Sequence, residues 1–183
     1  MMGEHVMNVA KYAIKNIWNF FPLIAFLETA RFYSEIGIMK WLYAYEISAM
    51  ASIFHIIIMY ATHQVINRII IGIDVYMIFG GFFTFFYQED VLSFLRMLHE
   101  SGMILSITVV GIFSMIFTRN SFLGSITVNE QSKKYSYYLL IISMFSTIFS
   151  YCFSGNILLS GVIPIVLLTV INKMLINKVD MNI

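Results

Sequence analysis

The chain has 183 residues, of which 60% are hydrophobic and only 11% are charged, and its formal net charge is +1. An ordinary soluble domain carries about 25% charged residues, so the composition excludes that class and indicates a membrane protein. A net charge so close to zero, with no basic stripe, argues against a nucleic-acid-binding protein. Nothing between the apolar segments is long enough to form another domain, so we expect residues 1–183 to be a single transmembrane domain.

The first segment, residues 1–16, has the pattern of a short amphipathic helix. Val6 and Ala13 fall near one face, whereas Lys11 and Lys15 lie elsewhere on the helix. Lysines in such a helix can contact anionic lipid headgroups. We therefore expect this segment to lie on the membrane surface.

Six apolar segments follow, and they are candidates for membrane-spanning helices. They are continuous apolar runs and not the alternating strands of an outer-membrane barrel, so the expected fold is an all-α, polytopic helix bundle. The first of these six segments, near residues 17–33, is ambiguous because Pro22 interrupts it and its apolar part already ends at Leu27. We expect six spans, or five if this first segment is interfacial or re-entrant. The spans are expected near residues 17–33, 41–62, 69–87, 103–118, 137–153 and 157–176.

Lysine and arginine residues determine the expected orientation. With six spans and the N-terminus inside, the cytoplasmic segments hold eight of the 11 Lys and Arg residues, and the outer segments hold three. By the positive-inside rule, both ends of the chain then lie in the cytoplasm. If the segment near residues 17–33 does not cross the membrane, the later helices keep this orientation. The N-terminus, with Lys11 and Lys15, then lies on the outer side, against the positive-inside rule.

Three ionisable residues lie within the predicted spans, namely Glu46, His55 and Asp74. Charged groups at bilayer depth are costly, so each residue is a functional candidate. In antiparallel neighbouring helices His55 and Asp74 fall at similar depths, about 10 and 7 Å from the cytoplasmic side, and we expect them to be in contact. The pair either carries protons or cations, or it holds two helices together. Glu46 lies near the opposite surface and faces another side of its helix.

Two polar connections are further candidates. The connection 119–134 contains Arg119, Lys133 and Lys134, and we interpret it as a cytoplasmic interaction loop. An acidic cluster on the outer side has two interpretations, a metal site or solvated loop charges. We favour loop charges because the spacing of the cluster matches no metal-binding motif. The cluster consists of Glu89, Asp90, His99 and Glu100.

The sequence contains no nucleophile elbow, no Ser-His-Asp arrangement, no P-loop and no dinucleotide-binding motif. We therefore expect neither enzymatic activity nor a bound cofactor or metal. Cys152 is the single cysteine, which excludes an intramolecular disulfide. We expect Cys152 to be a small packing residue.

Small residues and helix breakers predict local features of packing. Gly80-Gly81 predicts a close helix contact or a bend, and Pro164 predicts a kink in the last span. Stripes of small residues at i+4 spacing permit close packing, either within the chain or between copies in a homo-oligomer. The stripes are Ala44, Ser48 and Ser52, and Ser146, Ser150 and Ser154.

Several aromatic and aliphatic motifs occur in a fixed order along the chain. They are Asn19-Phe20-Phe21-Pro22-Leu23-Ile24-Ala25-Phe26, Phe79-Gly80-Gly81-Phe82-Phe83-Thr84, Tyr87-Gln88-Glu89-Asp90 followed by Phe94-Leu95, and Thr118-Arg119-Asn120-Ser121-Phe122-Leu123. Together with two further helices and a tail, this layout resembles the bacterial intracellular septation protein A family, which consists of small inner-membrane proteins of the cell envelope.

The resemblance implies a non-enzymatic role in envelope maintenance, cell elongation and septation, and it supplies no catalytic residues. Such a role would be exercised through membrane lipids or through other inner-membrane or division proteins. The residues themselves leave an alternative open, which is a small proton- or ion-coupled transporter that uses His55 and Asp74.

Overall fold

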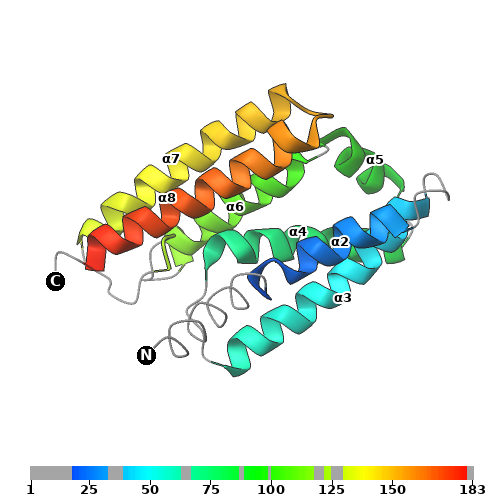
Figure 1. Ribbon diagram of the computed structural model, residues 1–183, viewed down its shortest axis with the longest axis horizontal. Helices are drawn as coiled ribbons and strands as arrows, with labels where there is room; N and C mark the ends of the chain where they lie inside the picture. Colours follow the sequence, from blue (N-terminus) through cyan, green and yellow to red (C-terminus); the bar gives the residue numbers. More distant parts are fainter. Residues whose placement is uncertain are drawn as a thin grey trace, which may run out of the picture.

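A computed structural model gives the three-dimensional structure of the chain (Figure 1). It describes residues 18–32, 39–62, 67–86, 89–98, 100–117, 122–124 and 130–180. The predicted amphipathic segment 1–16 lies outside the described residues, as do His99 and Arg119. Within the described ranges all regular structure is helical, as the sequence predicts.

The described residues form seven α-helices and one π-helical turn. They are α2 (Phe21–Phe32), α3 (Met39–Ala61), α4 (Arg68–Phe85), α5 (Glu89–Leu98), α6 (Ser101–Phe117), α7 (Glu130–Cys152), the π-helical turn η2 (Leu158–Val162) and α8 (Ile163–Asp180).

Four helical stretches are long and apolar enough to cross a membrane, and they correspond to α3, α4, α7 and η2 with α8. The spans predicted near 17–33 and 103–118 correspond to shorter helices, because α2 has 12 residues and α6 has 17. At 1.5 Å per residue α2 is about 18 Å long, whereas the apolar core of a bilayer is about 30 Å thick. The count of six spans therefore stays a prediction.

The helices form two groups, which are α2 to α4 and α6 to α8 (Figure 1). In the first group α3 packs against both α2 and α4, and in the second α7 packs against both α6 and α8. Contacts between α4 and α6 join the groups. A second link lies near the start of α4, where Nδ2 of Asn172 donates to Oδ1 of the N-cap residue Asn67 at 3.4 Å.

Small residues allow α3 and α4 to approach closely. A Cβ atom added to Gly81 would lie 2.4 Å from Cβ of Ala49, and one added to Gly80 would lie 2.3 Å from the ring of Tyr45. Because α4 is continuous through these glycines, they provide a close helix contact and not an interruption. The facing stripe on α3 is fully buried and consists of Ala44, Ser48 and Ser52.

Pro164 is the second residue of α8, but η2 runs directly into α8, so Pro164 lies within one continuous helical stretch. Its missing N–H leaves the carbonyl of Ser160, four residues earlier, without its α-helical donor. The hydroxyl of Ser150 on α7 donates to this carbonyl. Pro164 is thus accommodated by a side-chain contact that ties α7 to the beginning of α8.

The connection between α7 and α8 combines a glycine turn with the π-helical turn η2. Gly155 adopts φ 91°, a left-handed conformation that favours glycine. In η2 the N–H of Ile163 donates to the carbonyl of Leu158, five residues earlier, which widens the helix just before Pro164.

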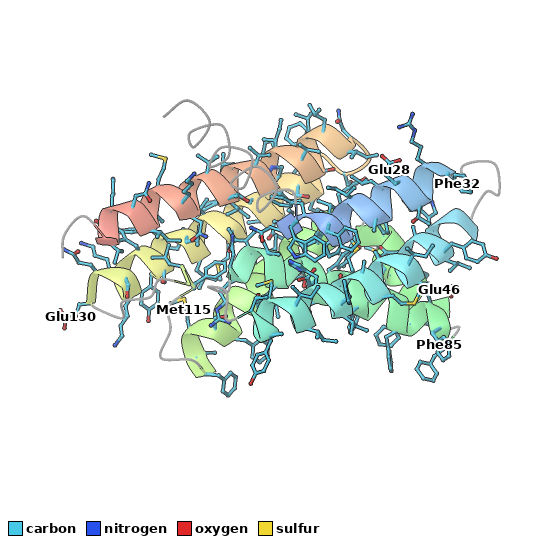
Figure 2. The ribbon with its side chains drawn as sticks, turned by 60° about the horizontal axis from the view of Figure 1, so that its bottom comes forward. Glu28, Phe32, Glu46, Phe85, Met115 and Glu130 are labelled. Carbon is cyan, nitrogen blue, oxygen red and sulfur yellow. The ribbon has the colours of Figure 1, made fainter. Side chains whose placement is uncertain are left out.

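Large apolar side chains cover the outside of the helices. Met50 on α3 is 65% exposed and Phe145 on α7 is 68% exposed. Figure 2 shows side chains projecting from the long faces, with Glu28 and Glu46 toward one end of the molecule and Glu130 at the other. Many serines point inward instead: the buried polar residues include ten serines. This pattern is the reverse of that of a soluble protein, in which exposed apolar patches are small.

Candidate functional site

His55 on α3 and Asp74 on α4 form a fully buried pair. Nδ1 of His55 lies 2.8 Å from Oδ2 of Asp74, which is hydrogen-bonding distance. Both side chains are 0% exposed. The contact predicted from their similar depth is therefore present, whereas a functional role for the pair stays a prediction.

The surroundings of the pair are closed. The ring of Trp18 stands edge-on to the imidazole of His55, with 6.2 Å between the ring centroids. Ser52 is adjacent to the carboxyl group of Asp74. Nε2 of His55 is buried without a hydrogen-bond partner among the described residues. The arrangement can share a proton between imidazole and carboxylate, and it also links α3 to α4.

The structure does not bring Glu46 to this pair. Glu46 is half-buried on α3, nine residues before His55, which corresponds to about 13 Å along the helix. The predicted basic loop also differs from the structure, because α7 already begins at Glu130. Lys133 and Lys134 are therefore exposed residues of a helix.

Two further sequence-based expectations can be compared with the described residues. Cys152 is exposed, so the expectation of a packing residue is wrong. No group of three His, Cys, Asp or Glu side chains in the described ranges is placed to hold a metal ion. Of the acidic cluster, Glu100 is partly buried and lies within hydrogen-bonding distance of Ser160.

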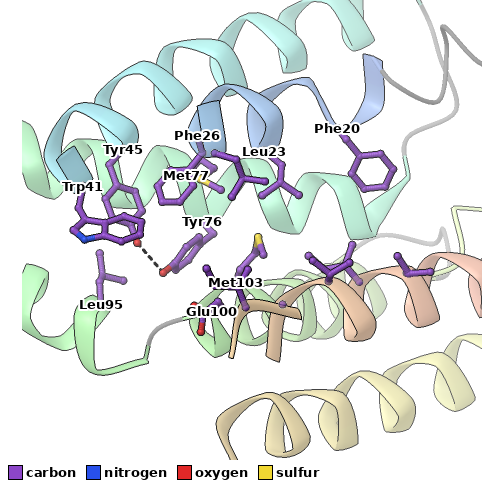
Figure 3. A pocket seen from close by; sticks show the side chains of 16 residues that line it. Phe20, Leu23, Phe26, Trp41, Tyr45, Tyr76, Met77, Leu95, Glu100 and Met103 are labelled. Atoms are coloured by element: carbon purple, nitrogen blue, oxygen red, sulfur yellow. Dashed lines mark hydrogen bonds between the residues drawn. The ribbon is translucent and has the colours of Figure 1, made fainter. Parts of the chain in front are cut away.

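A cavity of about 520 Å³ lies between the two helix groups. Figure 3 shows its 16 lining side chains, most of which are apolar. Tyr45, Tyr76 and Glu100 lie at one end of the cavity, and Phe20 lies toward the other (Figure 3). The hydroxyl groups of Tyr45 and Tyr76 are 2.9 Å apart, within hydrogen-bonding distance. His55 and Asp74 are not among the described residues that line this cavity.

The carboxylate of Glu100 is held at this polar end. The hydroxyl of Ser160, in η2, lies 3.0 Å from Oε2 of Glu100 and 2.8 Å from the carbonyl oxygen of Asn156, so its single proton can be donated to either acceptor. Sequence reasoning missed the cavity because its polar residues come from separate elements: Tyr45 and Tyr76 are 31 positions apart, and Glu100 and Ser160 are 60 positions apart. No spacing rule connects such residues, although an acidic residue directly before an apolar helix was a visible signal.

No family model, curated protein or solved structure matches this chain. The likeness to the septation protein A family therefore rests on the motifs in the sequence.

Proposed function

We propose that the chain is a non-enzymatic, multi-pass protein of the bacterial inner membrane that supports envelope maintenance, septation or cell division. In this proposal it acts through membrane lipids or through other inner-membrane or division proteins. The observation that carries the membrane location is the apolar exterior of four helical stretches long enough to cross a bilayer. The envelope role is supported by the resemblance of the sequence motifs.

The proposed topology has six crossing segments, with α2 and α6 as the short ones, and places both ends in the cytoplasm. The support for this orientation is the distribution of eight Lys and Arg residues on one side against three on the other. A five-span arrangement with α2 re-entrant differs only in the position of the N-terminus.

Two measurements test the proposal. The chain should stay with membranes after alkaline carbonate washing and float with vesicles in a density gradient. Depletion in the host bacterium should lengthen cells or delay septation, and a plasmid copy should reverse the defect. A soluble chain would contradict the membrane location, and unchanged cell length and envelope integrity on depletion would contradict the envelope role.

A second candidate function is proton- or ion-coupled transport through His55 and Asp74. The observation in its favour is their buried contact at 2.8 Å, together with Nε2 of His55, which has no hydrogen-bond partner among the described residues. Asp74→Asn separates the two functions. If the chain is a transporter, this variant should abolish a pH-dependent flux in proteoliposomes. If the chain acts through lipids or partners, the variant should still rescue depleted cells.

A further inference from the structure

The cavity between the two helix groups opens at an apolar rim. Five apolar or aromatic residues both line the cavity and are exposed at the surface, namely Leu27 at 47%, Trp41 at 38%, Ile157 at 54%, Val162 at 45% and Val166 at 54%. In a bilayer the medium around such a rim is the hydrocarbon of lipid chains. An apolar chain can therefore enter the cavity without crossing a polar barrier.

The cavity is elongated along the helices. On the side of η2 and α8 its lining extends from Ile157 to Val166, and on the side of α2 it extends from Phe20 to Leu27. At 1.5 Å per residue these stretches are about 13 and 10 Å long. This shape follows the direction of lipid chains in a membrane and suits one extended hydrocarbon chain.

The polar end of the cavity favours a cation. Glu100 is the only charged residue among the described residues that line the cavity. The aromatic rings of Trp41, Tyr45 and Tyr76 lie at the same end (Figure 3). A carboxylate among aromatic faces attracts an ammonium group through charge and cation–π interactions, whereas it repels an anion.

The carboxylate also has a hydrogen-bonding neighbour in the protein. The hydroxyl of Ser160 lies 3.0 Å from Oε2 of Glu100, and Ser160 itself lies in the π-helical turn just before Pro164. π-Helical turns occur frequently at functional sites. The exposed turn 153–156 precedes η2 directly, which places Glu100 near an end of the α7–α8 hairpin and therefore near the membrane surface in the proposed topology.

We propose that this cavity binds one hydrocarbon chain of a membrane lipid whose headgroup carries an ammonium group, with the ammonium against Glu100. The apolar walls receive the chain, and the carboxylate with its aromatic neighbours selects the headgroup. The proposal rests on the membrane location proposed above, but it does not depend on a role in septation.

The test uses the full chain reconstituted in vesicles of equal amounts of phosphatidylethanolamine and phosphatidylglycerol. After mild detergent extraction and washing, mass spectrometry gives the ratio of the two retained lipids. The wild-type chain should enrich the ethanolamine lipid about tenfold, the factor expected from one charge-assisted contact. Glu100→Gln should abolish the enrichment. Glu28→Gln, which changes an exposed glutamate outside the cavity lining, should preserve it.

A second pair of variants tests the chain-binding part of the cavity. Val166→Trp places a large side chain at the rim and should reduce the total retained lipid. Val170→Trp is the matched control, because Val170 is 51% exposed on the same helix and is not among the residues that line the cavity. Circular dichroism and gel filtration of all variants confirm that each chain is folded.

The outcomes separate this proposal from the proposed function. Equal ratios for the wild-type chain and Glu100→Gln, or enrichment of the anionic lipid, would overturn the lipid site while leaving the membrane location intact. A chain that fails to float with the vesicles would overturn both.

Discussion

Two contacts between polar side chains lie inside the bundle of apolar helices. His55 contacts Asp74, and Ser160 contacts Glu100. In a medium without water such groups must be satisfied inside the protein, because each unpaired polar group is costly. The two contacts differ in position, since the first is sealed between α3 and α4 and the second borders a cavity.

The pair of His55 and Asp74 should be strongly coupled. Replacing either residue alone by Leu leaves a buried ionisable partner, and we expect a loss of about 3–5 kcal/mol in unfolding free energy. The double replacement should cost less than the sum of the single losses by about 1 kcal/mol or more. Reversible unfolding in mixed micelles measures these values.

The control for this cycle combines Asp74→Leu with Glu46→Leu, whose losses should add because Glu46 is distant from the pair. Additive losses for His55 and Asp74 as well would refute their coupling.

These two contacts show what the sequence reveals about single residues. The meeting of His55 and Asp74 follows from helix rise and antiparallel packing, because each residue lies less than two turns from the end of its helix at the α3–α4 connection. The meeting of Glu100 and Ser160 depends on where the α7–α8 hairpin docks against the start of α6. Docking of this kind is a tertiary property that no local pattern encodes.

The boundaries of the helices depart from the apolar runs of the sequence for identifiable reasons. α7 begins at Glu130, before the predicted span near 137–153, because one face of its polar first turns, with Ser132 and Ser136, is buried while the other face is exposed. Ser136, for example, accepts from the N–H of Leu123 at 3.4 Å. α2 begins near Pro22, which is favoured in the first turn of a helix. Hydropathy alone reveals neither effect.

The interface of α3 and α4 should tolerate no added volume at Gly81. A Cβ atom there would lie 2.4 Å from Cβ of Ala49 and 2.9 Å from the carbonyl oxygen of Tyr45, so the backbones must separate. We expect Gly81→Val to lower the unfolding free energy by about 1–3 kcal/mol or more. Phe82→Ala is the neighbouring control, because Phe82 is 55% exposed and its loss should change stability little. Similar stabilities of the two variants would show that the helices do not pack this closely.

The junction of α7 and α8 offers a test of how Pro164 is accommodated. Ser150→Ala removes the donor to the Ser160 carbonyl and should cost about 1–3 kcal/mol, the penalty for an unsatisfied buried acceptor. Pro164→Ala restores a backbone N–H that can donate to the same carbonyl. In that background Ser150→Ala should cost less, as measured by thermal unfolding in detergent. An equal loss of stability in both backgrounds would show that the Ser150 hydroxyl does not compensate for the N–H that Pro164 lacks.

At the scale of the molecule, composition indicated a membrane protein, and the continuous apolar runs predicted an all-α bundle, because backbone polar groups in a bilayer must be paired within helices or a closed barrel. Composition does not reveal that the helices form two groups with a cavity between them. The cavity arises because α2 and α8 flank the α4–α6 contact without filling the space between them. Lining residues come from nearly every helix, so the site exists only in the assembled fold.

The orientation in the membrane can be measured with single cysteines, since Cys152→Ser yields a cysteine-free chain. Asn156→Cys lies in the exposed turn after α7, and Lys134→Cys lies on the exposed face near the start of α7. With 23 residues α7 is about 34 Å long, so the two sites lie on opposite sides of a bilayer.

In intact cells a membrane-impermeant maleimide should label Asn156→Cys, because the positive-inside rule places the Lys-containing end in the cytoplasm. Lys134→Cys should react only after the membrane is permeabilised, and that step also shows that both thiols are reactive. Labelling of Lys134→Cys alone in intact cells would show that the topology is the inverse of the proposed one. Equal labelling of both sites would show that α7 does not cross the membrane.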